Sequence, residues 1–320
     1  MNCLRYQIRH STVYEYSAPV TGAEHIVRLQ PRDLPRQRCL QYELSVDPPS
    51  DLKLEHVDYF GNHSALVTHR QSLTRLEITA RSVIQSQLPF IPEAAETPAW
   101  ETVRARVLTD RSSRGLEAIE YSYESGMVNH PPGIQEYAQQ SFPPNRPLLA
   151  AAKELTERIY QDFKFDPAAT TIATPLAEVL EKRRGVCQDF AHLEIACLRS
   201  MGLAARYVSG YLETDPPPGG FKLVGADASH AWVAVFCPEI GWIDLDPTNG
   251  CLPSLRHITI GWGRDYADVC PIRGVVNGGG TPDLQVAVDV IAVAPTVENS
   301  DQASSQVTVS GAEQAQDRTN

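Results

Sequence analysis

Three side chains that can together attack an amide bond follow one another along the second half of the chain: Cys187, His230 and Asp246. A cysteine sulfur attacks the carbonyl carbon, an imidazole carries the proton, and a carboxylate orients the ring and stabilises its charged form. The residue types alone are weak evidence, since almost any chain contains cysteine and histidine. In the structural alternative, Cys187 is a small buried helix residue, His230 is a strand histidine with satisfied hydrogen bonds, and Asp246 forms a turn.

The residues after Cys187 predict the helix that must position its sulfur. Apolar side chains recur every three or four residues, the spacing of one helix face, and Gly202 follows where such a helix would end. Cys187 then lies in the first turn, where unpaired backbone N–H groups and the helix dipole favour an anion. The thiolate, which is the nucleophilic form of cysteine, is therefore favoured there. The apolar positions of the run are Phe190, Leu193, Cys197 and Met201.

Two predicted strands carry the other two side chains. The strand that contains His230 places Trp232 on the same face, because side chains alternate along a strand. The next predicted strand, residues 242–246, turns Asp244 and Asp246 to one face and its aliphatic residues to the other. If the two strands are neighbours, His230 shares a face with one of the two aspartates, and the alternation does not choose between them.

Four short motifs in this order resemble a known family. Residues 147–250 are similar to the transglutaminase-like core of bacterial proteins, a branch of the papain-like cysteine enzymes. Residues 1–90 resemble the β-rich amino-terminal domain that accompanies this core. The segment 263–269 also resembles a family segment, and from its polar residues we expect it to cap the site from outside the core. The four motifs are Arg184–Phe190 (RGVCQDF), Ala205–Tyr211 (ARYVSGY), Asp227–Trp232 (DASHAW) and Asp244–Thr248 (DLDPT).

The resemblance implies a role for each of the three side chains. Cys187 corresponds to the nucleophile, His230 to the base and Asp246 to the acid that orients the base. It also favours Asp246 over Asp244, because the family's aspartate directly precedes a Pro-Thr pair, as Asp246 does here.

Other polar and aromatic residues are candidates for the oxyanion site or the substrate cleft. The backbone N–H of Cys187 is the favoured oxyanion donor, and Gln188 is a second candidate, although the next helix position can equally point away. Trp232 and Tyr211 are candidates for the cleft walls, with core packing as the alternative. His192 does not share the thiol's face of the helix, so we expect a structural role.

The pattern of the whole chain predicts an α+β fold in two main parts. Residues 1–90 alternate apolar and polar side chains in short runs, which is typical of an antiparallel β-sandwich. Residues 91–146 form a connector with helical patches. Residues 147–295 form the catalytic core, with helices packed on an antiparallel sheet, together with a C-terminal extension. The polar segment 296–320 has no apolar period, and we expect it to be disordered.

The composition argues against some classes of binding partner and indicates the cellular compartment. A net charge of −11 argues against nucleic acid or an anionic membrane as the main partner. A protein or peptide substrate is what the three reactive side chains and the family resemblance imply. The seven cysteines are scattered without a Cys-x-x-Cys pair, which argues against a disulfide framework or a zinc ribbon. Without an apparent leader or apolar span, we expect a reduced, cytoplasmic protein. No metal, nucleotide or flavin cofactor is implied.

These residues favour cysteine-dependent acyl transfer on amide bonds through a thioester. The expected cytoplasmic setting favours a peptide or isopeptide hydrolase, either protease-like or a deamidase. A true transglutaminase, in which an amine replaces water as the acceptor, uses the same side chains and stays an alternative. A binding scaffold that lacks turnover is the alternative from another class. A metal site made of Cys187, His192 and His230 is the weakest hypothesis, because their spacing matches no common zinc pattern.

Overall fold

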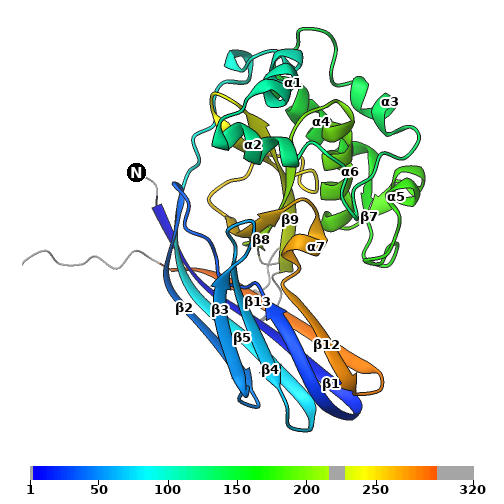
Figure 1. The fold of residues 1–320 in the computed structure, drawn as a ribbon. Helices are drawn as coiled ribbons and strands as arrows, with labels where there is room; N and C mark the ends of the chain where they lie inside the picture. Colours follow the sequence, from blue (N-terminus) through cyan, green and yellow to red (C-terminus); the bar gives the residue numbers. More distant parts are fainter. Residues whose placement is uncertain (1–2, 216–227, 294–320) are drawn as a thin grey trace, which may run out of the picture.

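The computed structural model describes residues 3–215 and 228–293, and it has two bodies (Figure 1). One body is a sheet of long strands, and the other is a helix-rich core around a smaller sheet. The segment 296–320, predicted to be disordered, and Asp227 of the third motif lie outside the described residues. None of the helices in the described part of the chain combines the length and the apolar character needed to cross a bilayer.

The N-terminal strands are β1 (Cys3–Val27), β2 (Gln37–Asp47), β3 (Leu52–Val57), β4 (His63–His69) and β5 (Leu73–Gln87). They form one antiparallel sheet in the order β2-β5-β1-β4-β3. The first part of β1 pairs with β5 and its last part with β4, and the two halves share one apolar core that includes Leu44, Val67 and Ile78. The antiparallel prediction is confirmed, but the architecture is one sheet that curls on itself and not two separate sheets.

Two strands from the end of the chain also belong to this sheet. They are β12 (Ile272–Gly278) and β13 (Pro282–Val293), and both pair antiparallel with β1. Residues 147–295 were predicted to form the catalytic core and a C-terminal extension, and the pairing places that extension in the N-terminal sheet. Alternating hydrophobicity identifies a strand but does not identify the sheet that the strand joins.

The core contains a second antiparallel sheet. Its strands are β8 (Ala205–Leu212), β9 (Ala228–Cys237), β10 (Gly241–Leu245) and β11 (His257–Gly263). The order is β10-β9-β8-β11, so the strands expected to carry His230 and Asp246 are indeed neighbours.

Helices surround this sheet, which confirms the α+β class. Helix α6 begins at Cys187 and contacts β8 and β9 across the largest apolar core, which contains Phe190 and Leu193. The remaining short strands β6 and β7 pair in parallel. The other elements are η1 (Ala94–Glu96), α1 (Trp100–Thr109), α2 (Ser113–Glu120), α3 (Ile134–Gln139), α4 (Leu148–Asp162), β6 (Lys164–Phe165), α5 (Leu176–Lys182), β7 (Arg184–Gly185), α6 (Cys187–Ser200) and α7 (Tyr266–Val269).

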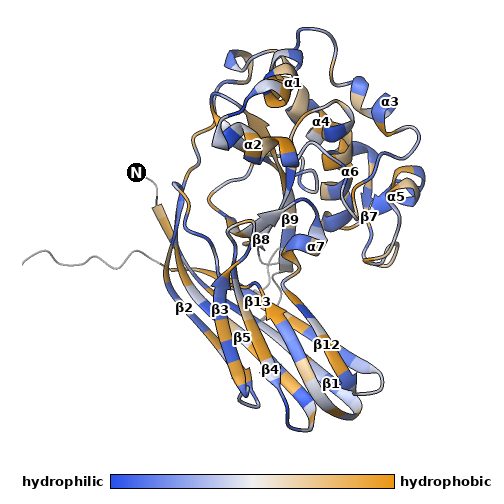
Figure 2. Cartoon of the chain, viewed as in Figure 1, coloured by the Kyte–Doolittle hydropathy of each residue, from blue (hydrophilic) through white to orange (hydrophobic). Residues whose placement is uncertain are grey.

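The two bodies meet along an apolar seam. Figure 2 shows hydrophobic and hydrophilic residues alternating along the long strands, so that each strand has an apolar face. Tyr6 and Ile8 of β1 and Val288 of β13 pack in one cluster with Tyr211 of β8 and Ile258 of β11. Because these side chains are buried, the seam fixes the N-terminal sheet beside the core sheet.

Candidate active site

The sulfur of Cys187 sits at the N-terminus of α6, as predicted. The carboxylate of Asp189 accepts hydrogen bonds from the Val186 backbone N–H (2.8 Å) and from the Thr170 hydroxyl (2.7 Å), which secures the first turn. A Cβ at Gly185 would lie only 2.6 Å from Asp189 Oδ2, so this close approach requires glycine. The local sequence therefore holds a partly exposed thiol at the positive end of the helix dipole.

His230 on β9 lies between the thiol and a carboxylate. Its Nε2 is 2.8 Å from Oδ2 of Asp246, which directly follows β10. The ring is also hydrogen-bonded to Cys187. Because Nε2 faces the carboxylate, Nδ1 is the nitrogen left to face the sulfur. The structure thus brings all three predicted side chains together in the order sulfur, imidazole, carboxylate.

The two charged groups of this arrangement stabilise each other. Burial lowers the pKa of His230, but hydrogen bonds to Asp246 and Cys187 outweigh burial and raise that pKa to about 10. Burial also opposes ionisation of Asp246, yet its hydrogen bonds from His230 and His257 hold the pKa of this carboxyl well below its usual range. At neutral pH the imidazole is therefore protonated, the form that stabilises a thiolate and protonates a leaving amine.

The loop after β10 completes the coordination of the carboxylate. Oδ1 of Asp246 accepts from the backbone N–H groups of Thr248 (3.0 Å) and Asn249 (3.2 Å). The Asn249 side-chain amide donates to Oδ2 at 2.7 Å. This carboxylate is completely buried, so these donors replace the water it has lost.

A second histidine, which the sequence analysis missed, also binds this carboxylate. Nε2 of His257 is 3.0 Å from Oδ2 of Asp246. Its Nδ1 accepts the Ser254 backbone N–H (3.1 Å), so the proton lies on Nε2 and that nitrogen donates to the carboxylate. A signal was present, because residues 257–263 (HITIGWG) alternate apolar with polar or small side chains, which is the pattern of a strand.

The other candidate aspartate has a different partner. Asp244 accepts a hydrogen bond from Arg36 at 2.8 Å, and Arg36 also donates to the Thr259 hydroxyl. The structure therefore places Asp246 against the imidazole and uses Asp244 to join the core to the N-terminal region. The family resemblance favoured the same aspartate.

Both bodies line the cleft in front of the sulfur. It has a volume of about 290 Å³, and Cys187 and His230 lie in its wall. Gln188 also lines it, which fits a donor to an oxyanion beside the Cys187 N–H.

Family models match both bodies. One described as the bacterial transglutaminase-like N-terminal region matches residues 6–85, and the transglutaminase-like superfamily model matches residues 135–247. Uncharacterized proteins from Mycobacterium tuberculosis and Mycobacterium bovis are 42% identical over 296 residues, which cover 90% of this chain and 92% of theirs. The chain belongs to the bacterial transglutaminase-like family.

Other proteins resemble this transglutaminase-like chain over different lengths. An uncharacterized Mycobacterium leprae protein is 30% identical and covers 91% of this chain and 99% of its own length. A protein-glutamine gamma-glutamyltransferase from Pseudomonas aeruginosa is 32% identical over 116 residues, 34% of this chain and 17% of that protein. A Cytophaga hutchinsonii structure, described provisionally as a cysteine protease, has a TM-score of 0.73 at 20% identity over 92% of each chain. Family and fold together make this a papain-like cysteine enzyme.

Two aromatic candidates do not line the cleft that the described residues form. Trp232 is completely buried, and its ring packs behind the imidazole of His230, with centroids 6.0 Å apart. A Cβ at Gly210 would lie 2.3 Å from the indole, so glycine makes room for it. The Tyr211 hydroxyl is 2.9 Å from Nδ1 of His10 in the seam between the bodies. Both aromatic rings pack in the transglutaminase-like core or its seam, which corrects the prediction that they form cleft walls.

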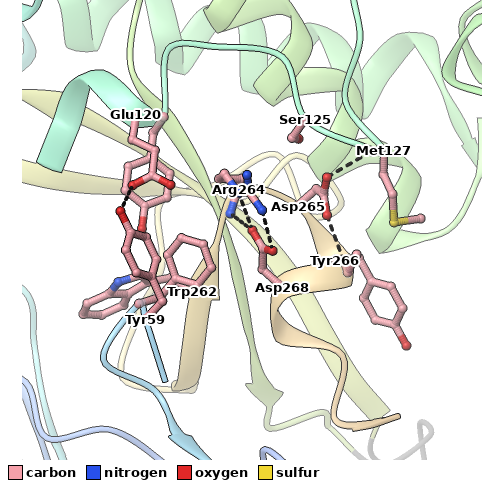
Figure 3. A network of polar contacts seen from close by, with 12 residues as sticks. Tyr59, Glu120, Ser125, Met127, Trp262, Arg264, Asp265, Tyr266 and Asp268 are labelled. Atoms are coloured by element: carbon pink, nitrogen blue, oxygen red, sulfur yellow. Dashed lines mark hydrogen bonds and ion pairs between the residues drawn. The ribbon is translucent and has the colours of Figure 1, made fainter. Parts of the chain in front are cut away.

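The segment expected to cap the site does reach it, through one side chain. Figure 3 shows Asp265 at the start of α7, where it accepts the Met127 backbone N–H at 2.9 Å. The next residue, Tyr266, lines the cleft and donates its backbone N–H to Nε2 of His192 at 3.1 Å. His192 therefore has the supporting role that was predicted.

That hydrogen bond also weakens the metal hypothesis, because it occupies the Nε2 atom of His192. In the described part of the chain, potential metal ligands gather instead at His230, Asp246 and His257, whose ligand atoms lie within 4.8 Å of one another. The hydrogen bonds of 2.8 and 3.0 Å that join them account for this arrangement without an ion.

Proposed function

We propose that this transglutaminase-like protein hydrolyses amide bonds of peptides or isopeptides through a thioester on Cys187. The observation that carries this proposal is the buried His230–Asp246 ion pair directed at a partly exposed sulfur at a helix N-terminus. A purely structural histidine has no need of a neighbouring thiol or of a carboxylate held by five donors.

The proposed reaction has two steps. The thiolate attacks the carbonyl carbon, and the oxyanion accepts hydrogen bonds from the backbone N–H of Cys187 and, in this proposal, from Gln188. The C–N bond breaks, and the amine leaves with the proton that His230 carried. Water then attacks the thioester and returns one proton to His230. This step releases a carboxylic acid and the thiolate.

A second function is favoured by one finding. The Pseudomonas aeruginosa relative is a protein-glutamine gamma-glutamyltransferase, and the stretch of similarity is 116 residues long. In such a reaction a glutamine carboxamide forms the thioester, ammonia leaves, and an amine attacks in place of water. The catalytic side chains do not distinguish these acceptors.

Mass spectrometry distinguishes the acceptors directly. The full chain is incubated with glutamine-containing peptides and a primary amine, with Cys187→Ala as the matched control. Shorter peptides indicate cleavage, exchange of ammonia for water indicates deamidation, and an amine adduct indicates transfer. Unchanged peptides, together with a Cys187 that iodoacetamide alkylates no faster than the exposed Cys251, would overturn the enzyme proposal in favour of a scaffold.

A further inference from the structure

Part of the N-terminal sheet lies opposite the catalytic sulfur. The cleft that contains Cys187 and His230 is also lined by residues of β1 and β13, which are far away in the sequence. Thr12 pairs with Val286, and Tyr14 pairs with Leu284, two residues further along the same pair of strands. We call these four residues the cleft strip.

The cleft strip continues the face of the sheet that forms the seam between the two bodies. Side chains two residues apart share a face of a strand, so Leu284 and Val286 lie on the same face as Val288 and Val290 of β13. Val288 and Val290 are buried under the core, whereas Leu284 and Val286 are 54% and 53% exposed. An apolar surface that is covered at the seam is thus uncovered in front of the sulfur.

Apart from the catalytic Cys187 and His230, the surroundings of the strip are uncharged. Among the residues that the structure describes, the cleft lining contains no aspartate, glutamate, lysine or arginine. His10, which lies next to the strip, has its pKa lowered to about 4 by burial and is uncharged at neutral pH. It is held by the hydroxyls of Tyr211 (2.9 Å) and Thr12 (3.2 Å). A charged group buried against this wall would find no partner, whereas an apolar group would cover exposed apolar surface.

We propose that the cleft strip is a substrate subsite that binds an apolar side chain next to the amide that Cys187 attacks. This inference rests on the proposed function and names its substrate class: peptides with an uncharged, apolar residue beside the reacting carboxamide. It also assigns the N-terminal sheet a part in substrate selection. Preference between apolar and small groups in such a pocket typically amounts to roughly tenfold or more.

Alkylation of Cys187 tests the subsite without a known substrate. Three reagents share one reactive group: iodoacetamide, its N-phenylethyl derivative and its N-carboxyethyl derivative. Second-order rate constants are measured on the full chain by mass spectrometry of the peptide that contains Cys187. We expect the phenylethyl reagent to react roughly tenfold faster than iodoacetamide, and the carboxyethyl reagent to react more slowly than both.

Variants locate the preference on the strip. The double variant Leu284→Ser, Val286→Ser should lose the phenylethyl preference and keep its iodoacetamide rate. Gln285→Ser, on the opposite face of the same strand, is the matched control and should keep the preference. Leu284→Lys, a second variant at a half-exposed position, should raise the rate with the carboxyethyl reagent.

The outcomes separate the subsite from the chemistry. Fast iodoacetamide labelling without a phenylethyl preference, or a preference that survives in the double variant, overturns the subsite alone. Labelling of Cys187 no faster than that of Cys251 overturns both the reactive thiolate and the subsite that depends on it. Retained preference without any amide turnover in the peptide assay would overturn the proposed hydrolysis and leave the strip as a binding surface.

Discussion

The two walls of the cleft each contain a buried histidine, one neutral and one protonated at neutral pH. His10, from the N-terminal sheet, is hydrogen-bonded to two hydroxyls, and burial lowers its pKa to about 4. His230, from the core, is almost as buried, but its bonds to Asp246 and Cys187 raise its pKa to about 10. Burial by itself makes a histidine neutral, and an anionic partner is what makes one a catalytic group.

The largest expected effect separates these two histidines. His230→Ala should lower kcat/KM by roughly 10⁴-fold or more, because it removes the group that is placed to move the proton. His10→Asn should change the same quantity by less than about tenfold. The measurement is turnover of the peptides identified by mass spectrometry. Similar losses in the two variants would mean that the assignment of roles to the two walls is wrong.

Removing the anionic partner should make His230 resemble His10. Asp246→Asn should keep the fold, since asparagine is nearly isosteric, and should lower kcat by roughly 10²–10⁴-fold. Without the carboxylate, the pKa of His230 falls, so the alkaline limb of the pH–rate profile should move to lower pH. The pH dependence of turnover of the peptides checks this, and an unshifted limb would contradict it.

The hydrogen bond from His257 to Asp246 tests how strongly the carboxylate supports His230. His257→Phe should lower kcat/KM by roughly tenfold, because one donor to a buried carboxylate is lost. His257→Gln keeps a donor and should recover most of the activity. Loss of the donor raises the pKa of Asp246, so the acid limb of the profile should move to higher pH in the Phe variant only. A loss of Tm without this shift would indicate a purely structural residue.

The smallest expected effect is on the free energy of unfolding. The contributions of His10 and His230 to it change with pH in opposite directions. His10 has a folded-state pKa below its ordinary value of 6.5, so its contribution is complete above pH 6.5 and is lost as pH falls toward 4. His230 has a raised pKa, so its contribution is complete below pH 6.5 and is lost as pH rises through about 10. His10→Asn should therefore reduce the loss of unfolding free energy between pH 6.5 and 4 by about 2 kcal/mol.

Chemical denaturation of the full chain at several pH values measures both trends. As a control within the same variant, His10→Asn should leave unchanged the loss of unfolding free energy near pH 10. If the unfolding free energy of His10→Asn fell between pH 6.5 and 4 by as much as that of the unsubstituted chain, His10 would not be the group that titrates.

Much of this site follows from local patterns in the sequence. The apolar period after Cys187 predicts the helix that begins there, and alternation predicts the strands of His230 and Asp246. Both patterns depend on which side chains a short segment must bury, so a single segment is enough to reveal them. The choice of Asp246 over Asp244 came from a family resemblance, because alternation places both on one face.

Only the tertiary structure decided which distant segments complete the cleft. The sequence determined a helix, two strands and three reactive side chains, because periodicity is a property of neighbouring residues. It did not reveal that His257 binds Asp246, or that β13 joins β1 and brings Leu284 to the cleft. Those contacts join residues from separate elements. They depend on how strands pair and pack so as to bury apolar surface over the whole molecule, and the sequence of one short segment does not determine that.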